Sequence, residues 1–193
     1  MIELDDAKKL FSFDKDLEPV LKVPSGETVR IRTKDCFGNQ LQGPEDQLSE
    51  IDWEAINPAT GPIYVEGAVG GGTLKVHIDN IELDAQTSSC TGEDEGVCGD
   101  RFSDWATHFC KVEDGKVVWD ERLSIPLAPM IGVIGVAPEG EPVNCGTPGK
   151  HGGNMDNTAI AAGATLYFPV AVDGALFGCG DMHAVMGDGE VSV

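Results

Sequence analysis

Frequent glycine and proline residues leave little room in this chain for long helices. There are 25 glycines and 11 prolines among 193 residues, and the segments between them are short runs of alternating or β-branched residues. Residues 28–33 alternate arginine with valine and isoleucine, and residues 74–79 show the same period of two. This is the period of a half-buried strand. The pattern predicts a mostly β fold, sandwich-like or barrel-like, with few short helices.

Several elements can be predicted by range. Residues 20–23 and 28–33 flank a turn-forming Pro-Ser-Gly-Glu sequence and are expected to form a hairpin. The continuous apolar run 165–172 predicts a strand buried on both faces. Helical spacing is scarce: residues 5–11 allow one or two turns, and residues 159–164 are too short and too rich in glycine to assign. Further strands are expected at residues 62–66, 116–119 and 131–136.

The domain organisation is predicted to be simple. Residues 1–193 form one mostly β region, with no internal repeat. The stretch from Cys90 to about Arg122 is acidic, rich in glycine and irregular, so residues 88–122 are the candidate for an inserted loop or small subdomain. The last residues alternate like a strand and stop without a turn. We therefore expect the chain to continue after Val193 or to be completed by a second chain from the same precursor.

Charge limits the classes of partner. The 33 acidic residues exceed the 13 basic ones, for a formal net charge of −20. Such a surface repels phosphate backbones and anionic membranes, so neither nucleic acid nor a membrane is expected as a partner. Solubility alone also accounts for most of the excess. The acidic start lacks the features of a signal peptide and no run reaches membrane-spanning length, so a cytoplasmic location is expected.

Six cysteines are spread along the chain without any Cys-x-x-Cys pair. A zinc ribbon is therefore not expected, and in a cytoplasmic protein most of these thiols should be free. Cys90 and Cys98 flank an acidic glycine-containing loop. They could form a disulfide, hold a metal or be two plain loop cysteines, and the sequence leaves these alternatives open.

The candidate site residues gather in the last fifty positions. The sequence HGGNMD at residues 151–156 is a glycine-flanked polar loop, whose exposed N–H groups could bind a carbonyl oxygen. A tight turn with local caps is an equally good interpretation. Asp181 and His183 lie two residues apart, which places both side chains on one face of a strand. Asp188 and Glu190 follow within a few residues. Such clustering of acids and imidazoles indicates a functional site.

Five segments of the chain are similar to one known family. They are residues 17–29, ending near Asp35 and Cys36, and residues 57–67, 134–138, 151–156 and 180–190. On these segments the chain resembles the acetamidase/formamidase family of amide hydrolases. Members of that family run on well beyond the last segment, and the cysteine-bearing stretch near residues 90–100 is not part of the family pattern.

The resemblance implies a mostly β fold, a homo-oligomer, and hydrolysis of formamide, acetamide or small lactams to carboxylate and ammonia. It also implies that eight residues match the polar segments of the family: Asp35, His151, Asn154, Asp156, Asp181, His183, Asp188 and Glu190.

Hydrolysis of an amide requires an activated water, a stabilised oxyanion and an acid for the leaving nitrogen. Glu190 is predicted to be the general base and acid, with Asp188 and His151 also predicted as catalytic. Asn154 is predicted to polarise the carbonyl of the small neutral amide. Asp181 and His183, joined by Asp35, are predicted to bind a divalent metal, either zinc or calcium, or to position the water.

Three alternatives are open at this point. The precursor could cut itself after Val193 and expose a nucleophilic Ser, Thr or Cys at the start of a second chain. An acidic β protein could be a metal-binding module without catalysis, although no regular calcium-loop spacing is present. The chain could also be a truncated, inactive homologue.

Overall fold

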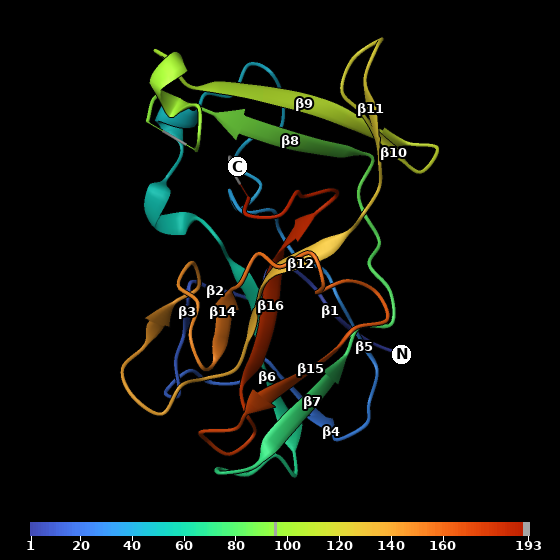
Figure 1. Ribbon diagram of the computed structural model, residues 1–193. Coiled ribbons are helices and arrows are strands. Elements are labelled where there is room, and N and C mark those ends of the chain that lie inside the picture. Colours follow the sequence, from blue (N-terminus) through green and yellow to red (C-terminus); the bar gives the residue numbers. More distant parts are fainter. Residues whose placement is uncertain (95, 191–193) are drawn as a thin grey trace.

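The computed structural model describes residues 1–94 and 96–190, and it is built almost wholly from strands (Figure 1). The expected mostly β fold is confirmed. The helical elements of these residues are three single-turn 3-10 helices: η1 (Leu48–Glu50), η2 (Trp53–Ala55) and η3 (Gly99–Arg101). Within the described residues, no helix is long and apolar enough to cross a membrane.

A curved six-stranded sheet forms the centre of the molecule (Figure 1). Its strands are, in order, β14 (Gly152–Asn154), β12 (Met130–Gly135), β16 (Phe177–His183), β6 (Ala59–Glu66) and β2 (Lys9–Leu10), with β4 (Leu21–Pro24) running parallel to β6. β16 is therefore a central strand, held by antiparallel ladders to β12 and β6. This position keeps its residues nearly fully buried from Phe177 to Asp181.

A separate antiparallel sheet lies above the first one in Figure 1. It consists of β11 (Ser124–Pro126), β10 (Lys116–Val118), β9 (Ala106–Glu113) and β8 (Gln86–Thr91). Residues 88–122 are more regular than the sequence indicates, because β9, β10 and the end of β8 lie within this stretch. Its described residues outside the strands are 92–94, 96–105, 114–115 and 119–122. Whether this sheet is a subdomain in its own right stays a prediction.

Three two-stranded ribbons complete the fold. They pair β1 (Ile2–Leu4) with β5 (Val29–Ile31), β3 (Ser12–Phe13) with β13 (Val143–Asn144), and β7 (Thr73–His77) with β15 (Thr165–Pro169). The strands predicted at residues 62–66, 74–79, 116–119 and 131–136 correspond to β6, β7, β10 and β12.

The predicted hairpin of residues 20–33 is wrong. β4 pairs in parallel with β6, and β5 pairs in parallel with β1. The turn between them exists, since Glu27 donates its N–H to the carbonyl of Pro24 at 3.3 Å. However, Val23 is 4% exposed and lies opposite Val65 of β6. Burial of that apolar face against β6 decides the pairing, because a strand pairs where its apolar side is covered.

Two other expectations also fail. Residues 5–11 form a turn followed by β2 instead of a helix, and Leu10 is buried while Lys9 is exposed. The alternation of β2 within the sheet overrides the weak helical spacing. The run 165–172 does contain β15, but Phe168 is the one fully buried residue of that strand, and Tyr167 is 66% exposed. A two-stranded ribbon covers only one face, so the strand is half-buried.

The two sheets meet where β16 ends. Ala184, the first residue after β16, is buried in a small apolar cluster with Cys110 and Val117 of the four-stranded sheet. Its carbonyl accepts a hydrogen bond from the N–H of Ala128, just before β12. The last residues of β16 and the segment that follows therefore lie at the junction of the two sheets (Figure 1). No disulfide joins the cysteines of the described residues, and Cys90 and Cys98 are not bridged to each other.

Candidate functional site

Four polar side chains converge at this junction, and we call them the acid cluster: Asp156, Asp181, His183 and Glu190. Ligand atoms of Asp156, Asp181 and His183 all lie within 4.8 Å of one another. Glu190 joins them because its Oε1 is 3.0 Å from Nε2 of His183. The other ring nitrogen, Nδ1, lies 3.3 Å from the backbone oxygen of Asp181 and 3.9 Å from its Oδ1.

The three carboxylates of the acid cluster are carried by unusual backbone. Asp156, Asp181 and Glu190 have φ values of +41°, +54° and +40°. Left-handed backbone is uncommon outside glycine, although Asp tolerates it better than most residues. The left-handed conformation of Asp181 occurs at the third residue from the end of β16, a central strand in which extended backbone is the rule. The strain is tolerated because the surrounding sheet holds it in place, as is typical of functional sites.

His183 and Glu190 form an ion pair within the acid cluster. Burial by itself would lower the pKa of His183, but the hydrogen bond to Glu190 and the nearby carboxylates of Asp181 and Asp156 raise it to about 9. The same hydrogen bond lowers the pKa of Glu190. The imidazolium and the Glu190 carboxylate are therefore both charged at neutral pH in the metal-free protein.

The other two carboxylates resist ionisation. Burial raises the pKa of Asp156 to about 7, helped by the hydrogen bond to Glu190 and by the charges of Glu190 and Asp181. Burial also raises the pKa of Asp181 to about 6, with the charges of Glu190 and Asp35 adding to it and His183 opposing it. Asp181 is 3% exposed. Several carboxylates held this close favour a proton or a cation between them.

One atom of the acid cluster lacks a partner among the described residues. Oδ1 of Asp156 is buried and makes no hydrogen bond. A buried carboxylate oxygen without a donor costs free energy. The unpaired oxygen therefore indicates a position where a ligand, a cation or a proton belongs.

A cavity of about 1170 Å³ opens beside the acid cluster. Its walls include Asp181, His183 and Glu190, and also Asp35 and Cys36, which come from the loop after β5. Asp181, His183 and Glu190 of the acid cluster therefore face a space that can hold a small molecule.

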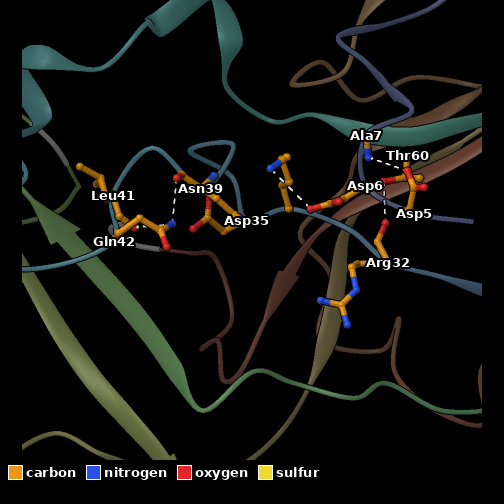
Figure 2. A network of polar contacts seen from close by, with 10 residues as sticks. Asp5, Asp6, Ala7, Arg32, Asp35, Asn39, Leu41, Gln42 and Thr60 are labelled. Carbon is orange, nitrogen blue, oxygen red and sulfur yellow. Dashed lines mark hydrogen bonds and ion pairs between the residues drawn. The ribbon is translucent and has the colours of Figure 1, made fainter.

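Asp35, predicted as a metal ligand, lines this cavity but lies outside the group of mutually close ligand atoms. Its Oδ1 accepts a hydrogen bond from the N–H of Asn39 at 2.7 Å, and its own N–H donates to Oδ1 of Asn39 at 3.0 Å (Figure 2). Burial raises its pKa. The carboxylate thus shapes the turn at residues 35–39, while its charge still acts on Asp181.

His151 and Asn154, both predicted as catalytic, lie on or beside β14. His151 is 6% exposed and its ring meets Phe13 edge-on at 5.3 Å between centroids. Burial lowers its pKa, which favours the neutral imidazole. Nε2 of His151 and Oδ1 of Asn154 are buried and unpaired within the described residues. No hydrogen bond or ion pair of those residues joins either side chain to the acid cluster.

Asp188, the remaining predicted catalytic residue, is exposed. Its Oδ1 accepts a hydrogen bond from the hydroxyl of Thr158 at 3.0 Å, and no ion pair of the described residues connects it to His183. The structure therefore brings together Asp181, His183 and Glu190 as the sequence predicts. It adds Asp156, which sequence patterns had marked only as a local cap in a glycine-rich loop. The resemblance was the one signal that named it.

Comparisons with known proteins show the family of this chain. A family model described as the Acetamidase/Formamidase family matches residues 4–144 and 143–193. The chain is 50% identical to a protein from the thermophile Thermoanaerobacter tengcongensis, described as a predicted acetamidase/formamidase, with a TM-score of 0.97. It is 45% identical to an acetamidase from Bacillus halodurans, again with a TM-score of 0.97. Both comparisons cover 100% of this chain.

These relatives are longer than this chain. It spans 64% of the Thermoanaerobacter protein and 65% of the Bacillus protein. An acetamidase from Mycolicibacterium smegmatis is 24% identical over 92% of this chain and 60% of its own length. The family match extends over nearly all of the sequence, including both polar segments of the acid cluster. The chain therefore belongs to the acetamidase/formamidase family.

Proposed function

We propose that this chain carries the catalytic site of an amide hydrolase that cleaves the C–N bond of short linear amides, of the formamide and acetamide type, to carboxylate and ammonia. Relatives bear the names acetamidase and formamidase. The observation that carries the proposal is the acid cluster: three carboxylates and an imidazole converge, and Asp181, His183 and Glu190 of this cluster line a cavity. A neutral amide reaches such an acidic protein without long-range repulsion.

Glu190 is the residue proposed to move the proton. Its lowered pKa keeps it ionised, and the hydrogen bond to His183 holds its carboxylate at the cavity wall. Water attacks the amide carbon while Glu190 takes one proton from it. The C–N bond then breaks as Glu190 returns this proton to the nitrogen, which leaves as ammonia. Asn154 stays a proposed polariser of the carbonyl, with His151 and Asp188 as further proposed catalytic residues.

We propose a divalent metal at the acid cluster. One imidazole and two carboxylates form a donor set that suits a catalytic zinc ion, whereas calcium takes oxygen ligands. Asp156, Asp181 and His183 would hold the ion, and the unpaired Oδ1 of Asp156 agrees with a missing ligand. A bound divalent ion polarises the amide carbonyl. Nδ1 of His183 faces Asp181 and is the nitrogen that would hold the ion. The Glu190 carboxylate, hydrogen-bonded to Nε2, would orient the ring. Asp35 is a proposed additional ligand.

The partners of the chain are proposed from its resemblance to the family. We propose a homo-oligomer, which light scattering after size-exclusion chromatography would test. A second chain cut from the same precursor is the alternative partner, and intact mass of the purified protein tests it.

Ammonia release from formamide, acetamide and propionamide tests the proposed function directly. Glu190→Gln keeps the size of the side chain but removes the base, and we expect turnover to fall by about 10² or more. Glu141→Gln is the matched control, because Glu141 is exposed and no hydrogen bond or ion pair of the described residues joins it to the acid cluster. Near-normal turnover of Glu190→Gln would remove the role of Glu190.

The ammonia assay and a measurement of zinc binding together distinguish the remaining alternatives. A wild-type protein that binds zinc but releases no ammonia from any of the three amides favours the metal-binding module without catalysis. A protein that neither binds zinc nor releases ammonia favours the inactive homologue.

A further inference from the structure

Gly132 faces the acid cluster from the neighbouring strand. It belongs to β12, where Ile131 lies opposite Met182 and Val133 lies opposite Gly180 of β16. Gly132 is therefore the residue opposite Asp181. Its φ lies outside the left-handed region, so glycine is not required there by backbone conformation. The reason for a glycine at this position must be sought in the space around it.

That space is filled by carboxylate oxygens. A β-carbon placed on Gly132 would lie 2.4 Å from Oδ2 of Asp181 and 2.6 Å from Oδ1 of Asp156. Non-bonded contacts this short essentially never occur between a β-carbon and an oxygen atom. The two oxygens thus approach each other from β16 and from the loop after β14, over the bare Cα of Gly132. One of them is the buried oxygen of Asp156 that has no partner among the described residues.

We propose that Gly132 is a positioning residue of the acid cluster: the missing side chain lets the carboxylates of Asp156 and Asp181 come close enough to share one bound cation, a role that rests on the proposed function. Even a methyl group would push at least one carboxylate away by about 1 Å, since ordinary carbon–oxygen contacts begin near 3.4 Å. Gly132 itself touches neither the substrate nor the metal in this account. It acts through the two aspartates.

The variant Gly132→Ala tests this role without removing any functional group. We expect its affinity for zinc, measured by calorimetry with zinc alone, to fall about 10- to 100-fold. Turnover of formamide should fall about 10²-fold, the usual effect of a 1 Å misplacement. Gly140→Ala is the matched control, because a β-carbon at Gly140 meets nothing within 4 Å and its backbone is equally ordinary.

A second comparison keeps the test independent of activity. Asp156 and Asp181 both have left-handed backbone, so glycine suits both positions. Adding Gly132→Ala to the double variant Asp156→Gly/Asp181→Gly should therefore leave the melting temperature unchanged, while Gly132→Ala alone should lower it by several degrees. The triple variant also remains testable if Gly132→Ala alone does not fold.

The outcomes separate the two claims. Zinc affinity of Gly132→Ala equal to wild type overturns the positioning role, and so does an equal loss of melting temperature in both backgrounds. If the wild-type protein binds no zinc or releases no ammonia, the proposed function fails. In that case the comparison of melting temperatures still decides whether Gly132 makes room for the two carboxylates.

Discussion

The ion pair of His183 predicts how the stability of the metal-free protein depends on pH. The folded protein holds the pKa of His183 at about 9, against 6.5 for an unperturbed histidine, with burial opposing the hydrogen bond to Glu190 and the charges of Asp181 and Asp156. Because the folded pKa is raised, the contribution to stability is fully present below pH 6.5. It is lost as the pH rises from 6.5 through about 9.

The magnitude follows from the size of the rise. Each unit of pKa corresponds to about 1.4 kcal/mol, so a rise from 6.5 to about 9 corresponds to about 3 kcal/mol. The His183 side chain is only 17% exposed, so solvent screens the pair weakly. For a chain of this length, about 3 kcal/mol lowers the melting temperature by about 6–12 °C.

The assay is urea unfolding with a metal chelator present, at pH values from 6 to 9.5, for wild type and His183→Gln. The variant cancels the contributions of titrating groups outside the acid cluster. Asp156 and Asp181 do not cancel, because the charge of His183 lowers their pKa values and their own loss of stability with rising pH grows when that charge is removed. We therefore expect wild type to lose up to about 3 kcal/mol more than the variant over this range. Parallel curves for the two proteins would refute the reasoning.

Three further predictions concern other parts of the molecule. Phe13 is 1% exposed and packs against His151, so Phe13→Ala should lower the free energy of unfolding by about 3–5 kcal/mol; a loss below about 1 kcal/mol in urea unfolding contradicts this. Burial and the neighbouring charges of Asp181 and Asp35 raise the pKa of Cys36 well above its usual range, whereas Cys98 is exposed. Iodoacetamide at pH 8 should therefore alkylate Cys98 before Cys36, as followed by peptide mass spectrometry, and the reverse order would be inconsistent with the structure. Asp188 accepts a hydrogen bond from Thr158 outside the acid cluster, so Asp188→Asn should lower formamide turnover far less than Glu190→Gln, and an equal loss would contradict this ranking of the two proposed catalytic residues.

Local patterns predicted the strands but not their partners. The alternation of residues 28–33 and 74–79 correctly indicates β5 and β7. The hairpin expected from the turn at residues 24–27 fails because Val23 is buried against β6, far along the chain. A turn sequence reports only what the backbone can do locally. Which face becomes covered depends on contacts between distant segments.

The same limit applies to the site. Spacing alone places Asp181 and His183 near each other, since both lie on β16. It does not show that Asp156 joins them from the loop after β14, nor that Asp35 engages Asn39. The position of Asp156 depends on the antiparallel ladders that set β12 between β14 and β16, whereas the contact of Asp35 with Asn39 is local to one turn.

The sequence by itself determined the strand-rich class and the family, because periodicity and motif segments are properties of local sequence. Tertiary structure decided which acids meet. The convergence of Asp156 and Asp181 over Gly132 requires two neighbouring strands in one register and a left-handed turn of the backbone at each aspartate. The physical reason is that like charges approach closely only where a packed sheet holds them, and packing is a property of the whole fold.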